Sequence, residues 1–105
     1  MARVRIAPFA DFPNETGLRV DVAGHRVAMF RVGDRVFAIG DRCSHAEASL
    51  AEGEVFDDEV ECPRHGAAFG LSDGCARSLP ATSPVPVYEV DVEDDVVYLT
   101  IDEES

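Results

Sequence analysis

Two cysteines and two histidines in the middle of the chain have side chains that commonly bind metals. They form two short groups, Cys43-Ser44-His45 and Cys62-Pro63-Arg64-His65, separated by sixteen residues. Thiolate and imidazole are ligands that iron and zinc prefer. Each group offers one sulfur and one nitrogen, so two adjacent groups can bind one metal ion through both sulfurs and a second through both nitrogens. The spacing therefore predicts a metal centre on two neighbouring loops.

This pattern resembles the signature of the Rieske ferredoxins, which is C-x-H followed, after a gap like the one here, by C-x-x-H. The resemblance extends over nearly the whole chain. Residues 65–74 look like the family's HGxxFDxxTG segment, and residues 79–84 look like its proline loop. The chain departs from the family at Gly70, which is usually Asp, and at Asp73, which is usually Thr. Neither is a ligand position, so these departures concern only the local turn.

The resemblance implies one Rieske-type [2Fe–2S] cluster, in which two histidines replace two cysteines on one iron. Cys43 and Cys62 would hold the buried iron, and His45 and His65 the outer iron. A structural zinc site is the alternative, because zinc accepts the same four ligand atoms. Zinc sites usually gather paired cysteines and then paired histidines, whereas the two types alternate here. The order therefore favours the iron–sulfur cluster.

The side chains expected near the cluster predict a low reduction potential. In high-potential respiratory Rieske proteins, a disulfide joins the two ligand loops, and Ser and Tyr hydroxyls point at the cluster. The matching positions in this chain are Ala48, Arg64, Ala67 and Phe69, which supply neither the bridge nor those hydroxyls. We therefore expect a potential near the lower end of the family range, roughly −150 mV.

The remaining residues argue against catalysis by this chain. A terminal oxygenase needs a mononuclear iron bound by two histidines and a carboxylate, but only His25 is left once the cluster is bound. The chain has no G-x-G-x-x-G motif for a dinucleotide. The resemblance implies a one-electron carrier of a dioxygenase-type system. It would pass electrons from an NAD(P)H-dependent flavin reductase to a non-haem iron oxygenase, both docking at a tip formed by residues 43–49, 62–67 and 80–84.

Three other functions compete with this interpretation. A Rieske carrier in another process, such as iron–sulfur assembly, would have the same sequence features. A zinc-stabilised interaction module would keep the ligands without redox activity. The nitrite-reductase small-subunit type has the Rieske fold but lacks the ligands, so the presence of all four here argues against it.

Charge and composition bear on partners and compartment. The net charge is −12, and residues 43–105 carry sixteen of the 21 acidic residues but only two of the nine arginines. Such a surface repels nucleic acid and anionic lipid and attracts a basic partner. Three cysteines make a poor disulfide framework, and the chain shows no signal-peptide or membrane-spanning segment. We expect a cytoplasmic monomer.

Short apolar–polar alternations separated by turn residues predict an all-β fold. We expect a single Rieske domain over residues 1–105, built as an antiparallel β-sandwich with an inserted two-loop cluster-binding subdomain at about 43–84. One helical turn is predicted over Ala46–Leu50. The predicted strands cover Ala2–Ile6, Leu18–Val22, His25–Val32, Arg35–Ile39, Glu54–Phe56, Glu59–Glu61, Ala67–Leu71, Val87–Val92 and Val96–Ile101.

Five further residues receive structural interpretations. Cys75 is predicted to be a small buried apolar residue, because four ligands already complete the site. Phe69, Pro80 and Pro84 are predicted to shield the cluster from solvent. His25, at the start of a strand, is predicted to lie on the surface.

Overall fold

The computed structural model describes residues 2–42, 48–63, 66–77 and 83–101. Antiparallel strands dominate this part of the chain, with two short 3-10 turns, η1 (Phe9–Asp11) and η2 (Leu50–Glu52). The predicted all-β fold is therefore confirmed. The strands are β1 (Ala2–Pro8), β2 (Gly17–Val22), β3 (His25–Val32), β4 (Arg35–Gly40), β5 (Glu54–Phe56), β6 (Glu59–Glu61), β7 (Ala68–Gly70), β8 (Val87–Glu93) and β9 (Val96–Ile101).

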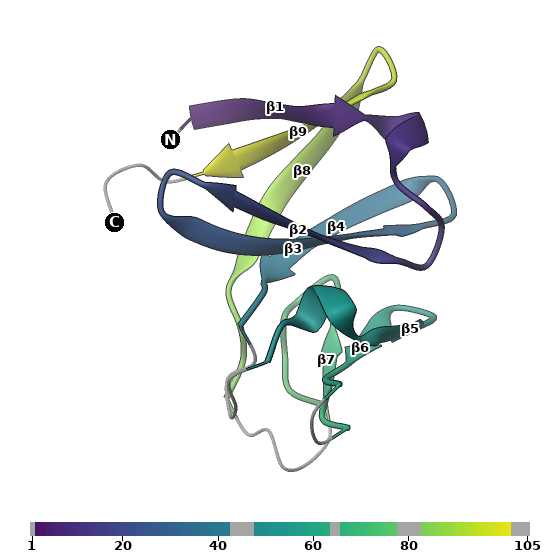
Figure 1. The fold of residues 1–105 in the computed structure, drawn as a ribbon, viewed down its shortest axis with the longest axis vertical. Helices are drawn as coiled ribbons and strands as arrows, with labels where there is room; N and C mark the ends of the chain where they lie inside the picture. Colours follow the sequence, from purple (N-terminus) through teal and green to yellow (C-terminus); the bar gives the residue numbers. More distant parts are fainter. Residues whose placement is uncertain (1, 43–47, 64–65, 78–82, 102–105) are drawn as a thin grey trace.

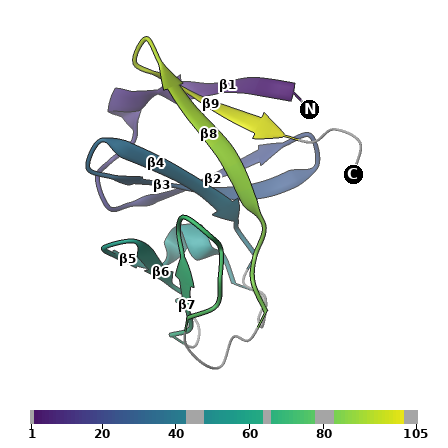
Figure 2. The same ribbon diagram turned by 180° about the vertical axis from the view of Figure 1, so that it is seen from behind.

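The strands form two sheets of different size. The larger sheet has six strands in the order β1-β9-β8-β4-β3-β2, and the smaller has three in the order β5-β6-β7. Figure 1 shows the small sheet below the large one, and the view from behind in Figure 2 shows β8 descending along one side toward it. The small sheet comes from the chain between β4 and β8, so it is an insertion, as predicted.

Strand β3 lies between two hydrophobic cores and contributes buried side chains to both. Val27 and Met29 pack into one core, whereas Ala28 and Phe30 pack into the other, because successive side chains of a strand point to opposite faces. The first core lies within the large sheet, and its other buried members are Phe12, Ala38, Val97, Leu99 and Ile101. The second joins the large sheet to the insertion, and its other buried members are Ile39, Leu50, Val60, Cys62, Ala67, Phe69, Leu71 and Val85.

The tight turns use residues that tolerate a left-handed backbone. Asp94 and Asp95, between β8 and β9, have φ angles of 52° and 62°. Two successive positive φ angles are typical of the turn that matches the twist of a hairpin. The strands predicted over Val87–Val92 and Val96–Ile101 are therefore present and form a hairpin, with five residue pairs in register between them.

Several predicted elements differ from the structure in their bounds. β1 ends at Pro8 and not at Ile6, and β2, β4 and β8 are each one residue longer than predicted. The strand predicted over Ala67–Leu71 is shorter and covers Ala68–Gly70. Part of the helical turn predicted over Ala46–Leu50 lies outside the described residues, and the turn that is described, η2, begins at Leu50. Within the described ranges, no helix is long and apolar enough to cross a bilayer.

Candidate metal centre

Of the four predicted ligands, the structure describes Cys62. The other three, Cys43, His45 and His65, lie outside the described residues. Cys62 is 1% exposed and carries a free thiol. The predicted centre can therefore be assessed through Cys62 and through the residues at the ends of the two ligand loops.

The second ligand loop connects β6 to β7 and closes through its own backbone. The N–H of Cys62 donates to the carbonyl of Ala67 at 2.6 Å, and the N–H of Gly66 donates to the carbonyl of Cys62 at 3.0 Å. Gly66 has a φ of 75°, a conformation that favours glycine. Both backbone polar groups of Cys62 are thus satisfied within the loop, and its sulfur is the group left for a ligand role.

The first ligand loop is closed by Asp41, which lies two residues before Cys43. The N–H of Leu50 donates to the Asp41 carbonyl at 2.6 Å, and the Ser49 hydroxyl donates to Asp41 Oδ1 at 2.7 Å. Arg42 and Ser49 also form an antiparallel bridge. Residues on both sides of the loop are therefore held together at its base.

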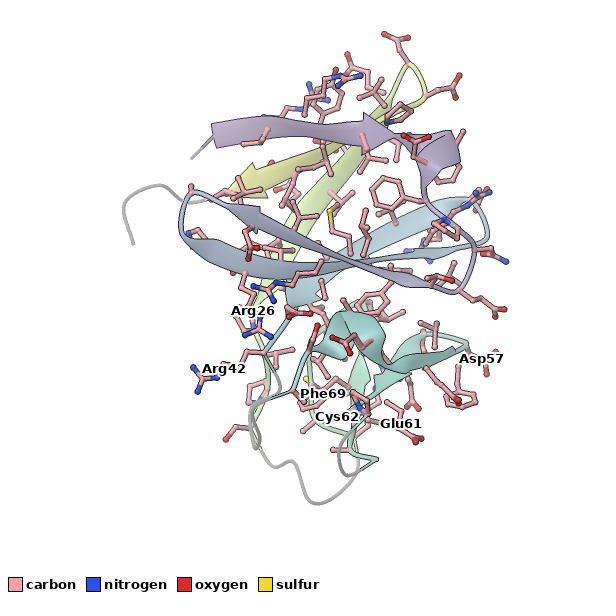
Figure 3. All side chains as sticks on the ribbon, in the orientation of Figure 1. Arg26, Arg42, Asp57, Glu61, Cys62 and Phe69 are labelled. Carbon is pink, nitrogen blue, oxygen red and sulfur yellow. The ribbon has the colours of Figure 1, made fainter. Side chains whose placement is uncertain are left out.

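The bases of the two loops lie close together. Leu50, just after the first loop, and Cys62, in the second, belong to the same core. The chain at Gly53 approaches β6 so closely that a Cβ there would overlap the carbonyl oxygen of Glu61. In Figure 3, the labelled Arg42, Glu61 and Cys62 lie in the lower half of the molecule, with the insertion. This arrangement fits a metal centre held by one sulfur and one nitrogen from each loop.

The segment that resembles the proline loop is anchored at its described end. The N–H of Val85 donates to the carbonyl of Gly74 at 2.9 Å, and the N–H of Gly40 donates to the carbonyl of Pro86 at 2.8 Å. These bonds join the segment to the insertion and to β4. Pro84 is exposed, and Pro80 lies outside the described residues, so their predicted shielding role remains a prediction.

The two departures from the family pattern, Gly70 and Asp73, occupy one small region. A Cβ on Gly70 would lie 2.6 Å from Nη2 of Arg77 and would overlap Oδ1 of Asp73. Asp73 Oδ1 also accepts a hydrogen bond from the N–H of Cys75 at 3.0 Å. The carboxylate of Asp73 therefore fills space beside residue 70, where the family usually has the side chain of Asp.

Arg77 joins this region to the turn between β5 and β6. Its Nη1 lies 3.1 Å from Oδ1 of Asp58 and 3.1 Å from Oε2 of Glu59. The hydrogen bond from Arg77 lowers the pKa of Asp58, and the bonds to Asp58 and Glu59 raise the pKa of Arg77. Arg77 thus ties the turn between β5 and β6 to the chain after β7.

Two of the structural interpretations were wrong or incomplete. Cys75 is exposed, not buried, because the turn that holds its N–H against Asp73 leaves its side chain outside the core. His25 is half-buried, and its Nδ1 lies 3.2 Å from the hydroxyl of Tyr88. Burial raises the pKa of Tyr88.

The structure describes three of the four positions that match the disulfide and hydroxyl positions of high-potential Rieske proteins. Ala67 and Phe69 are fully buried and Ala48 is half-buried. None of the three has a hydroxyl, and the fourth position, Arg64, lies outside the described residues. Phe69 packs in the core that contains Cys62.

A family model described as the Rieske [2Fe–2S] domain matches residues 2–89. Among curated proteins, the chain is 44% identical over 104 residues to the 3-phenylpropionate/cinnamic acid dioxygenase ferredoxin subunit of Shigella boydii. This match covers 98% of this chain and 97% of the relative.

Solved structures give the same picture. One chain of a complex of reduced oxygenase and oxidized ferredoxin in carbazole 1,9a-dioxygenase matches with a TM-score of 0.87 and 39% identity, covering 92% of this chain and 91% of that one. The ferredoxin of carbazole 1,9a-dioxygenase from Nocardioides aromaticivorans matches with a TM-score of 0.90 and 35% identity, covering 94% and 97%.

Proposed function

This chain belongs to the Rieske [2Fe–2S] domain family, and we propose that Cys43, His45, Cys62 and His65 hold its cluster. The cofactor is one Rieske-type [2Fe–2S] cluster, which supplies one-electron redox chemistry when bound. The described part of the site supports this ligand set, because Cys62 is a buried free thiol whose backbone groups are satisfied within the loop. We further propose that residues 1–105 form one domain, with a cluster-binding tip at about 43–84.

The chain is an electron carrier for an oxygenase and is not itself the catalytic component. The observation that carries this conclusion is the 44% identity, over 98% of the chain, to a dioxygenase ferredoxin subunit. In our proposal, the electron arrives from an NAD(P)H-dependent flavin reductase and leaves toward a non-haem iron oxygenase. His45 and His65 would bind the outer iron and give the electron its shortest path out, so both partners would dock at the tip.

The predicted low potential also belongs to this proposal. Hydrogen bonds to the cluster sulfurs raise the potential because they stabilise the reduced state. Ala67 and Phe69 lack side-chain groups that could donate such bonds. The expected potential is therefore near the lower end of the family range, roughly −150 mV.

The proposed carrier acts as a monomer in the cytoplasm. A reducing compartment keeps the ligand thiols available. The net charge of −12 would attract basic surfaces on its redox partners, since exposed charges steer association.

Electron paramagnetic resonance of the dithionite-reduced protein, combined with iron and sulfide analysis, tests the cofactor and its ligands. We expect a rhombic signal whose average g value is below that of the free electron, from two irons and two sulfides per chain. His45→Ala should abolish this signal, whereas Cys75→Ser should leave it unchanged because Cys75 is outside the ligand set. A protein with one zinc and no sulfide would refute the proposal, as would loss of the signal in Cys75→Ser alone.

A further inference from the structure

Asp41 lies at the base of the first ligand loop and is completely buried. Its side chain accepts three hydrogen bonds. Oδ2 accepts from Nε of Arg26 at 2.7 Å, and Oδ1 accepts from the Ser49 hydroxyl at 2.7 Å and from the N–H of Ala51 at 2.9 Å. A buried carboxylate is costly unless it is paired and hydrogen-bonded. These three donors meet that requirement.

The backbone of Asp41 is also fully used. Its N–H donates to the carbonyl of Arg26 at 3.1 Å, and its carbonyl accepts from Leu50 at 2.6 Å. The first of these bonds extends the pairing of β3 with β4 by one residue beyond the Val27–Gly40 pair. Asp41 therefore joins the start of the loop to the large sheet.

The end of the loop is attached through the same residue. Ser49 precedes η2, yet its hydroxyl does not cap that turn and bonds to Asp41. The N–H groups of Leu50 and Ala51 also donate to Asp41. One buried residue thus binds the chain on both sides of residues 42–48, which include Cys43 and His45.

We infer that Asp41 is a positioning residue for Cys43 and His45, holding the two ends of their loop together and to the large sheet. The inference rests on the proposed function, because it takes these two residues as cluster ligands. Asp41 acts as a hydrogen-bond acceptor and does not touch the reacting atoms. Groups that orient metal ligands typically change metal affinity by roughly 10-fold to 100-fold when they are replaced.

Asp41→Asn and Ser49→Ala weaken the hydrogen bonds at the base of the loop while changing the size of the side chains little. Asn has nearly the same size as Asp, but one oxygen cannot replace two acceptor oxygens facing three donors. Ser49→Ala removes only the link across the loop. Asp57→Asn and Ser72→Ala are matched controls, because both positions are exposed and lie outside this network. All variants would be compared with the wild-type protein after cluster loading.

The measurements are the rate of iron release to a ferrous chelator, the g values and the midpoint potential. For Asp41→Asn we expect iron release about 10-fold faster or more, with shifted g values. Ser49→Ala should change in the same direction by a smaller factor, and both controls should match the wild-type protein.

Two results would overturn the inference while leaving the proposed function intact. One is that Asp41→Asn releases iron at the rate of Asp57→Asn with unchanged g values. The other is that Asp41→Asn lowers the thermal unfolding midpoint but keeps the wild-type g values and the wild-type rate of iron release, both measured well below that midpoint. Asp41 would then only stabilise the fold. A wild-type protein without iron and sulfide would refute the proposed function and this inference together.

Discussion

Replacing Gly70 with Asp should destabilise the wild-type protein. In a protein that already carries Asp73→Thr, the same replacement should cause no further loss of stability. A Cβ on Gly70 would lie 2.6 Å from Nη2 of Arg77 and would overlap Oδ1 of Asp73. The carboxylate of Asp73 must then move, and it loses the 3.0 Å hydrogen bond from the N–H of Cys75. A hydrogen bond of this kind contributes about 1 kcal/mol.

The double variant gives the decisive comparison. Asp73→Thr alone removes the same carboxylate and should also cost about 1 kcal/mol. Both single variants lose the same hydrogen bond, which runs from the N–H of Cys75 to Asp73. The double variant, Gly70→Asp with Asp73→Thr, loses this bond only once, so it should also cost about 1 kcal/mol and not the sum of the two single effects. The new carboxylate at position 70 would lie beside Arg77, as the usual family residue would.

Urea unfolding of the cluster-loaded protein measures this coupling. With an m value of about 1–3 kcal/mol/M, each single variant should lower the midpoint by roughly 0.3–1 M, and the double variant by no more than that. Ser72→Asp is the control, since it adds the same charge to an exposed position in the same turn. If the double variant shows the sum of the single shifts, residues 70 and 73 are independent and the packing argument is wrong.

Two more predictions concern charge. Arg77→Met should raise the pKa of Asp58 toward its ordinary value of 3.8, because the hydrogen bond from Arg77 lowers it; carbon NMR titration of Asp58 measures this. The stability that the Arg77–Asp58 pair contributes should be fully present above pH 3.8 and should disappear as the pH falls through the lowered pKa of Asp58 in the folded protein. If Asp58 titrates in Arg77→Met as it does in the wild-type protein, the prediction is wrong. Raising the salt concentration should slow electron transfer to the redox partners, because exposed charges are screened beyond about 8 Å at physiological ionic strength. A rate independent of salt would mean that the acidic surface does not steer docking.

The strands could be predicted from the sequence because their burial alternates with the period of two that sheet geometry imposes. β9 shows this plainly, since Val97, Leu99 and Ile101 are buried and the residues between them are half-buried. Turn chemistry fixed the hairpins in the same local way. Periodicity does not predict the order of the strands in the large sheet, nor which of the two cores each buried side chain joins. Both features depend on contacts between residues that are distant in sequence.

The candidate site was only partly predictable for the same reason. The ligand types and their spacing are local features and were read directly. Asp41 was missed as a loop anchor, because its partners Arg26 and Ser49 are fifteen residues before it and eight after it. Arg77 was also missed, since its bonds to Asp58 and Glu59 span nineteen and eighteen residues. An Asp directly after an apolar strand and two residues before a candidate ligand is a sequence signal that could have drawn attention to Asp41.

The contacts that hold the ligand loops imply that the fold precedes the cluster. Small zinc-binding domains unfold when the metal is removed, because they have little core of their own. Here the bases of both loops are closed by protein hydrogen bonds, and β3 is buried in two cores, through Met29 on one face and Phe30 on the other. Removal of iron and sulfide should therefore leave the amide protons of β3 and β4 protected from exchange. If that protection disappears with the cluster, the cluster organises the scaffold, and the reasoning that the scaffold positions the ligands is wrong.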